Sequence, residues 1–138
     1  VILGRAGYQA WAGYWPDARA DQGFAAFINT VPKFVASRTL EGPLSWQNST
    51  RIEGDLETFV RGLKSRQGGE IAVMGGLSLV RQLLFAGLLD ELTLITHPVI
   101  AGRGRRLFEP TDPTTRLELK DATRTSKGNV VSTYRHRR

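Results

Sequence analysis

Residues 70–87 read EIAVMGGLSLVRQLLFAG, and this stretch decides the fold. The segment from Ile71 to Met74 is almost continuously apolar, which is typical of a short strand buried on both faces, and it stops at two glycines. Leucines and a valine then recur at helical spacing, with Ser78 placed to cap the helix and Gly87 placed to end it. The stretch predicts a strand, a glycine turn and a helix.

The glycine turn is a candidate phosphate site. Gly75 and Gly76 let another group approach the backbone, and the helix that starts at Leu77, Ser78 and Leu79 points unpaired N–H groups and a positive dipole end outward. This geometry suits a phosphate. The alternative is that the glycines only make a tight turn.

Strands and helices alternate along most of the chain. We expect strands at residues 1–3, 33–37, 49–52 and 92–99, and helices at 8–15, across 24–31 and from 55. This α/β alternation predicts a mainly parallel sheet covered on both faces, including a strand-helix-strand unit over 71–99. Residues 117–124 and 130–135 flank a turn and predict an antiparallel hairpin that closes the sheet.

Composition narrows the class of protein. The 138 residues suit a single domain, 1–138, and the absence of cysteine excludes disulfides and thiol chemistry. No apolar run is long enough to span a bilayer, and we expect a cytoplasmic protein. The net charge of +6 favours an anionic partner. Because the arginines are dispersed and not interleaved with aromatic residues, a phosphorylated small molecule is favoured over nucleic acid.

Two further strand ends carry groups that bind phosphate. Gly4 and Arg5 follow the first strand, and Ser37, Arg38 and Thr39 follow the next one. Guanidinium and hydroxyl groups together suit the 2′-phosphate of an adenine dinucleotide. The alternative is a surface salt bridge for the arginines and a plain turn for the hydroxyl residues.

Four motifs stand in order along the chain: GRAGY at 4–8, SRT at 37–39, GGLSLV at 75–80, and DEL at 90–92 leading to HPV at 97–99, GRG at 102–104 and LF at 107–108. Together they resemble the dihydrofolate-reductase-like family over essentially the whole chain. The most similar branch is the reductase domain of the bifunctional riboflavin-biosynthesis deaminase-reductase, with its stand-alone bacterial relatives.

The resemblance implies an NADPH-dependent reductase with a three-layer dihydrofolate-reductase-like fold. It places Gly4, Arg5, Ser37 and Arg38 at the adenosine phosphates of NADPH, with Thr39 beside them. It also places Gly75, Gly76 and the helix start at residues 77–79 at the pyrophosphate and nicotinamide. By the same resemblance, a cis peptide bond between Gly75 and Gly76 is a hypothesis.

The chain departs from the family pattern in two respects. Gly7 stands where the family usually has threonine, which removes a hydroxyl and predicts weaker cofactor binding. The family's first strand and helix would precede Val1, so the chain looks N-terminally incomplete. Because that part of the family carries the acid of true dihydrofolate reductases, no catalytic residue is assigned.

The leading hypothesis is hydride transfer from NADPH to a small pterin-like, pyrimidine or carbonyl/imine substrate. Its rival is a non-catalytic nucleotide-binding or scaffold protein that keeps the fold. His97 is interpreted as a structural residue at a strand end, and no residues have metal-ligand spacing. The predicted hairpin leaves strand edges exposed, and the resemblance implies relatives that often dimerise. Both features predict a homodimer.

Overall fold

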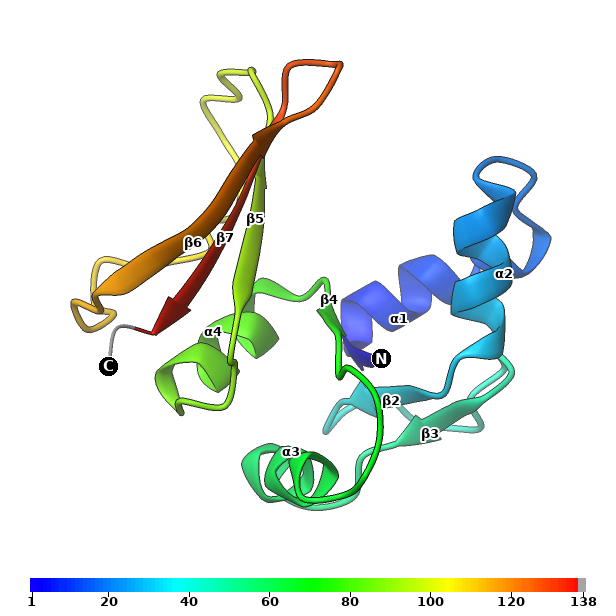
Figure 1. The fold of residues 1–138 in the computed structure, drawn as a ribbon. Coiled ribbons are helices and arrows are strands. Elements are labelled where there is room, and N and C mark those ends of the chain that lie inside the picture. The colour runs from blue at the N-terminus through cyan, green and yellow to red at the C-terminus, as the bar shows by residue number, and fades with distance from the viewer. Residues whose placement is uncertain (137–138) are drawn as a thin grey trace. The chain divides into compact units, whose positions relative to one another are not determined.

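A computed structural model describes residues 1–136. The chain forms two compact units, which we call the parallel unit, residues 1–80, and the antiparallel unit, from residue 81 onward. Figure 1 shows the elements of both units. The mixed α/β class predicted from the sequence is confirmed.

The parallel unit is built on a four-stranded sheet with the order β3-β2-β1-β4. Its strands are β1 (Ile2–Gly4), β2 (Lys33–Ala36), β3 (Ser49–Arg51) and β4 (Val73–Met74). Every neighbouring pair is parallel. All four strands therefore end at the same edge of the sheet, and the loops that leave this edge carry the predicted phosphate-binding residues.

Helices lie between β1 and β2, between β3 and β4 and after β4, whereas a loop without a helix joins β2 to β3. The helices are α1 (Arg5–Ala12), α2 (Gln22–Thr30), α3 (Leu56–Lys64) and α4 (Leu77–Phe85), with a short 3-10 helix, η1 (Trp15–Asp17), between α1 and α2. Helix α1 begins earlier than the predicted 8–15, because Gly4 adopts the extended N-cap conformation at the end of β1. Helix α4 runs from the parallel unit into the antiparallel one.

Side chains on the two faces of the parallel sheet pack against different helices. On one face Leu3, Tyr8, Ile28, Val35 and Trp46 form a buried cluster that joins β1 and β2 to α1 and α2. On the other face the rings of Phe34 and Phe59 lie 5.1 Å apart and join β2 to α3. The alternation along β2 is what a strand covered on both faces requires.

Lys33 lies inside this unit with no exposed surface. Its ammonium donates hydrogen bonds to the carbonyl oxygens of Ile28 at 2.8 Å and Val31 at 2.9 Å, where α2 ends, and it stands 4.5 Å from the centre of the Trp46 ring. Burial lowers the pKa of Lys33. The lysine therefore satisfies carbonyl groups at the C-terminus of α2 that have no partner within the helix.

The antiparallel unit contains a three-stranded sheet with the order β5-β7-β6. Its strands are β5 (Leu92–Thr96), β6 (Leu117–Arg124) and β7 (Val130–His136), and both pairs are antiparallel. The predicted hairpin is confirmed, but the expectation that it closes the parallel sheet is wrong, since in the described residues it pairs with β5 in a separate sheet. The prediction of a parallel strand-helix-strand unit over 71–99 is wrong, since β4 and β5 belong to different sheets and β5 pairs only with β7 in the described chain.

The exposure of β5 explains why its sequence was misleading. Leu92 is buried, but Ile95 is 58% exposed and most other residues of the strand are accessible. The same run of apolar and threonine residues is compatible with a buried parallel strand and with a half-exposed antiparallel strand.

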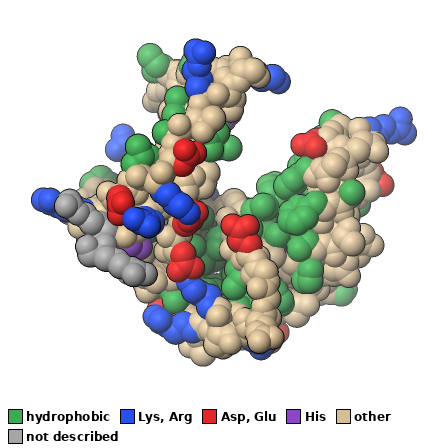
Figure 2. All heavy atoms as spheres, in the orientation of Figure 1, with side chains coloured by type: hydrophobic (Ala, Val, Ile, Leu, Met, Phe, Trp, Pro, Cys, Tyr) green, Lys and Arg blue, Asp and Glu red, His purple; other side chains and the backbone are tan. Residues whose placement is uncertain are grey.

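Ion pairs join charged side chains of the antiparallel unit. They are Glu118–Arg135 and Glu91–Lys120, and Figure 2 shows acidic and basic side chains mixed there.

Candidate functional site

The carboxyl edge of the parallel sheet brings together two glycines that are far apart in sequence. A Cβ atom built on Gly76 would lie 3.7 Å from the Cα of Gly4 and 3.8 Å from its nitrogen. Strands β1 and β4 are neighbours, so the turns that follow them meet at this point. The contact leaves backbone without side chains at the surface between two helix starts, as a close-lying ligand requires.

The turn after β4 needs glycine for its conformation. Gly75 has φ = +63° and Gly76 has φ = +85°, a region that other residues adopt at a cost. The hypothesis of a cis bond between them is wrong, because the described residues contain no cis peptide bond. Ser78 is also not the cap that the sequence predicted, since α4 begins one residue before it, at Leu77. Gly87 does adopt the predicted left-handed conformation after α4, with φ = +66°.

Helix α1 presents a start that no side chain caps. Its N-cap is Gly4, which makes no side-chain hydrogen bond, and the first turn contains no acidic residue. The first N–H groups of a helix have no intrahelical partner and carry the positive end of the dipole. An anion placed beside Gly4 therefore finds donors that the protein itself leaves unused.

The backbone N–H groups at the start of α4 differ in whether they have an acceptor within the helix. The N–H groups of Leu79 and Val80 donate to the carbonyl oxygen of Gly76 and are committed to the helix. Leu77 and Ser78 lie in the first turn, where N–H groups have no intrahelical acceptor, and Ser78 is exposed. Leu79 is 6% exposed, so its side chain contributes packing.

Ser37 orders the turn that follows β2. Its Oγ accepts hydrogen bonds from the backbone N–H of Thr39 at 3.2 Å and of Leu40 at 2.9 Å. A hydroxyl has two acceptor positions and one donor hydrogen, so both acceptor positions are occupied. What remains is an O–H that can only donate, and this matches a phosphate oxygen, which accepts.

The two candidate arginines are exposed. Arg5 is the first residue of α1, and Arg38 follows Ser37 beyond the end of β2. Neither forms an ion pair with any residue in the part of the chain that the structure describes. The salt-bridge alternative raised from the sequence therefore has no support at either position, and both guanidinium groups are free to bind a phosphate.

Sequence reasoning missed Arg51, the last residue of β3. Its Nη2 donates to the carbonyl oxygen of Gly42 at 2.8 Å, while its Nε is buried and has no partner. The signal in the sequence is an arginine at the end of a third strand, like Arg5 and Arg38 after the first two.

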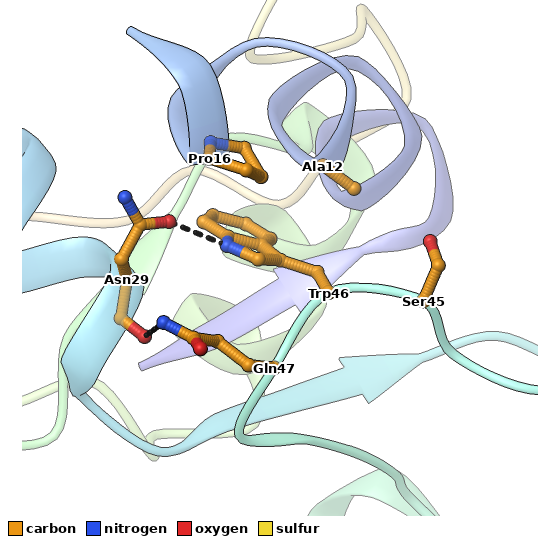
Figure 3. Close-up of a pocket in the computed structure, with 6 residues that line it drawn as sticks. All are labelled: Ala12, Pro16, Asn29, Ser45, Trp46 and Gln47. Atoms are coloured by element: carbon orange, nitrogen blue, oxygen red, sulfur yellow. Dashed lines mark hydrogen bonds between the residues drawn. The ribbon is translucent and has the colours of Figure 1, made fainter.

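A pocket of about 270 Å³ lies elsewhere in the parallel unit. Figure 3 shows its lining, in which the Trp46 ring lies near Asn29, and the other lining residues are Ala12, Pro16, Ser45 and Gln47. The indole Nε1 donates to Asn29 Oδ1 at 2.7 Å, and the Gln47 amide donates to the Asn29 carbonyl at 3.0 Å. Asn29 and Gln47 precede β2 and β3, so the pocket lies toward the amino ends of the strands, away from the glycine contact.

Other candidate chemistry finds little support. His97 is exposed just after β5 and its carbonyl accepts from the Val99 N–H, as expected of a structural strand-end residue. Within residues 1–136 no cluster of acidic or histidine side chains could hold a metal ion. In the same residues, none of the helices has both the length and the apolar character needed to cross a bilayer.

The sequence model of the RibD C-terminal domain matches residues 1–131. The chain belongs to this family. The resemblance to the reductase domain of the riboflavin-biosynthesis enzyme, stated from four motifs, is thereby confirmed. Among curated proteins, the uncharacterized protein YyaP of Bacillus subtilis (strain 168) is 31% identical over 140 residues, which is 99% of this chain and 72% of YyaP.

Solved structures of other proteins share this fold. A putative riboflavin biosynthesis protein from Shewanella sp. PV-4 has a TM-score of 0.77 at 20% identity, covering 99% of this chain and 73% of that one. A pyrimidine reductase-like protein from Corynebacterium diphtheriae has a TM-score of 0.69 at 16% identity, covering 99% and 75%. At these identities the likeness concerns the fold of the RibD C-terminal domain.

Proposed function

We propose that this protein is an NADPH-dependent reductase that transfers a hydride to a small pterin-like, pyrimidine or carbonyl/imine substrate. The observation that carries the proposal is the close approach of the Gly4 and Gly76 backbones, where the starts of α1 and α4 follow adjacent strand ends. Membership of the RibD C-terminal family supports a reductase. The residues at the strand ends support NADPH as the cofactor.

The cofactor fits the groups at this edge. The glycine contact and the first-turn N–H groups of α1 and α4 would hold the pyrophosphate, because they offer donors and no side-chain bulk. Ser37, Arg38 and Thr39 would hold the 2′-phosphate, with Arg5 adding positive charge. When bound, NADPH supplies the hydride, and the protein supplies position and electrostatics.

The first experiment is a titration of the protein with NADPH and with NADH, followed by tryptophan fluorescence. Trp11, Trp15 and Trp46 all lie in the parallel unit and provide the signal. Tighter binding of NADPH supports the 2′-phosphate site, and absence of binding to either cofactor refutes the proposal. The double substitution Arg5→Ala and Arg38→Ala should weaken NADPH binding about a hundredfold and change NADH binding little.

Turnover decides between an enzyme and a binding protein. Oxidation of NADPH in the presence of pyrimidine, pterin or carbonyl substrates supports the reductase. Saturable binding of NADPH with no oxidation across that panel would favour the non-catalytic protein instead. The homodimer and the cytoplasmic location stay predictions. Sedimentation velocity tests the homodimer.

A further inference from the structure

Arg51 is the partly buried cation at the carboxyl edge that the proposed site does not use. It ends β3, opposite Val35 in the neighbouring strand β2. One of its guanidinium nitrogens, Nη2, bonds the Gly42 carbonyl, and the buried Nε bonds nothing in the described chain. Arg51 also has no carboxylate partner among residues 1–136. A positive charge kept partly buried without compensation needs a reason, because an apolar side chain would cost less.

The bond to Gly42 falls in the middle of a loop that is held at both ends. At its start, the Leu40 N–H donates to Ser37 Oγ, and at its end, the Trp46 N–H donates to the Tyr8 hydroxyl at 3.1 Å. Between these bonds, the Arg51–Gly42 bond is the one hydrogen bond that the described structure gives residues 41–45. Gly42 has φ = +76°, and Pro43 has no N–H to donate.

This loop leads directly out of the phosphate-binding turn. The Ser37 hydroxyl is oriented by its two backbone donors, and one of them is Leu40, the first residue of the loop. If the loop moves at Gly42, Leu40 is no longer fixed and the Ser37 hydroxyl is free to rotate. The energetic link from Arg51 to Ser37 therefore runs through Gly42 and Leu40.

We propose that Arg51 is a positioning residue for the 2′-phosphate of NADPH. It holds the loop so that the Ser37 hydroxyl and the Arg38 guanidinium are arranged before the cofactor arrives, and its uncompensated charge makes the same strand end attractive to an anion. The inference rests on the proposed function. It differs from a merely structural role because NADH, which lacks this phosphate, should be nearly indifferent to Arg51.

The test compares Arg51→Met, Arg51→Lys and, as a control, Arg66→Met, which removes an exposed arginine beyond α3. Arg51→Met should raise the dissociation constant for NADPH about tenfold because the site is no longer preorganised, and that for NADH less than about twofold. Arg51→Lys should recover most of the loss, and Arg66→Met should change neither cofactor. Equal losses for both cofactors, or no loss at all, would overturn the inference.

A second measurement needs no cofactor. Amide hydrogen exchange of Thr39 and Leu40, whose N–H groups donate to Ser37 Oγ, should be faster in Arg51→Met than in the unmodified protein, while the strands β1 and β2 keep their protection. Unchanged exchange there would also overturn the inference. Should Arg51→Met prove unfolded by circular dichroism, Arg51→Gln replaces it in both measurements.

The two failures are distinguishable. If the unmodified protein shows no preference for NADPH, the proposed function fails and Arg51 loses its role with it. If that preference is present and Arg51→Met leaves it intact, the 2′-phosphate site stands and only the role of Arg51 is refuted.

Discussion

The strands of the parallel and the antiparallel units pair in opposite directions and through different connections. In the parallel unit, strands of two to four residues are joined by helices and by one long loop, and their shared edge collects residues from distant parts of the sequence. In the antiparallel unit, the long strands β6 and β7 pair through a tight turn, and their contacts are local. The parallel unit therefore gathers the candidate binding residues at one edge, whereas the antiparallel unit is built mainly from the pairing of neighbouring strands.

The two units also differ in how they treat charge. The parallel unit buries Lys33 completely and leaves Arg5 and Arg38 without ion pairs to described residues. The antiparallel unit pairs Glu118 with Arg135 across its exposed strands. Paired exposed charges contribute little to stability, while a buried cation is either well bonded or costly.

The largest effect is expected at Lys33. Lys33→Met removes the donor that satisfies the carbonyl oxygens of Ile28 and Val31, and it should lower the free energy of unfolding by about 3 kcal/mol. The control is Lys127→Met at the exposed hairpin turn of the antiparallel unit, where little change is expected. Urea denaturation measures both. Equal effects of the two substitutions would contradict the contrast between the units.

Alanine substitutions at two glycines of similar φ distinguish an effect on backbone conformation from an effect on cofactor binding. Gly76 in the glycine turn and Gly128 in the hairpin turn have φ = +85° and +80°. Alanine at either position should cost about 1 kcal/mol of stability because the left-handed conformation is strained. Gly76→Ala should in addition weaken NADPH binding about tenfold or more, because it places a methyl group beside Gly4. If both variants bind NADPH alike, Gly76 is only a turn residue.

A third substitution should stabilise the parallel unit. Gly7 lies within α1, and a Cβ there would meet nothing closer than the Met74 carbonyl oxygen at 3.9 Å. Gly7→Ala should raise the free energy of unfolding by roughly 0.5–1 kcal/mol through helix propensity. Gly62→Ala in α3 is the control, since its Cβ would also find open space. Thermal unfolding of both variants measures the gain, and destabilisation by Gly7→Ala alone would show that α1 has no room there.

The smallest effects are expected in the dependence of stability on pH. Hydrogen bonds from the Thr58 backbone and side chain lower the pKa of Asp55, and Arg135 lowers the pKa of Glu118, first by hydrogen bonding and then by its charge. Because both pKa values are lower in the folded protein, each contribution is present above the unfolded value near 4 and is lost as the pH falls through the folded value.

Thermal unfolding at pH 7 and pH 3 tests this. Asp55→Ala removes the N-cap of α3 and should lower the unfolding temperature by a few degrees at pH 7 but less at pH 3. Glu118→Gln should show the same trend with a smaller amplitude. A difference from the unmodified protein that widens on acidification would contradict the assigned direction.

Much of the site could be predicted because its signals are local. The glycine turn at Gly75 and Gly76 follows from two residues that alone tolerate the conformation, and the hairpin over Leu117–Arg124 and its partner strand follows from a turn between alternating residues. The failures were non-local. The sheet that β5 joins depends on a partner almost 40 residues away, and the hydrogen bond from Arg51 to Gly42 forms only where the fold brings the loop beside the end of β3.

The sequence by itself determined the order of the elements, the α/β class, the glycine turn and the family, since local conformational preference and motif spacing are written in neighbouring residues. Only the tertiary structure decided which strands pair, that Gly4 touches Gly76, that Lys33 is enclosed and that Arg51 reaches Gly42. These contacts join residues far apart in the chain. Their free energy depends on burial and geometry that no single stretch contains.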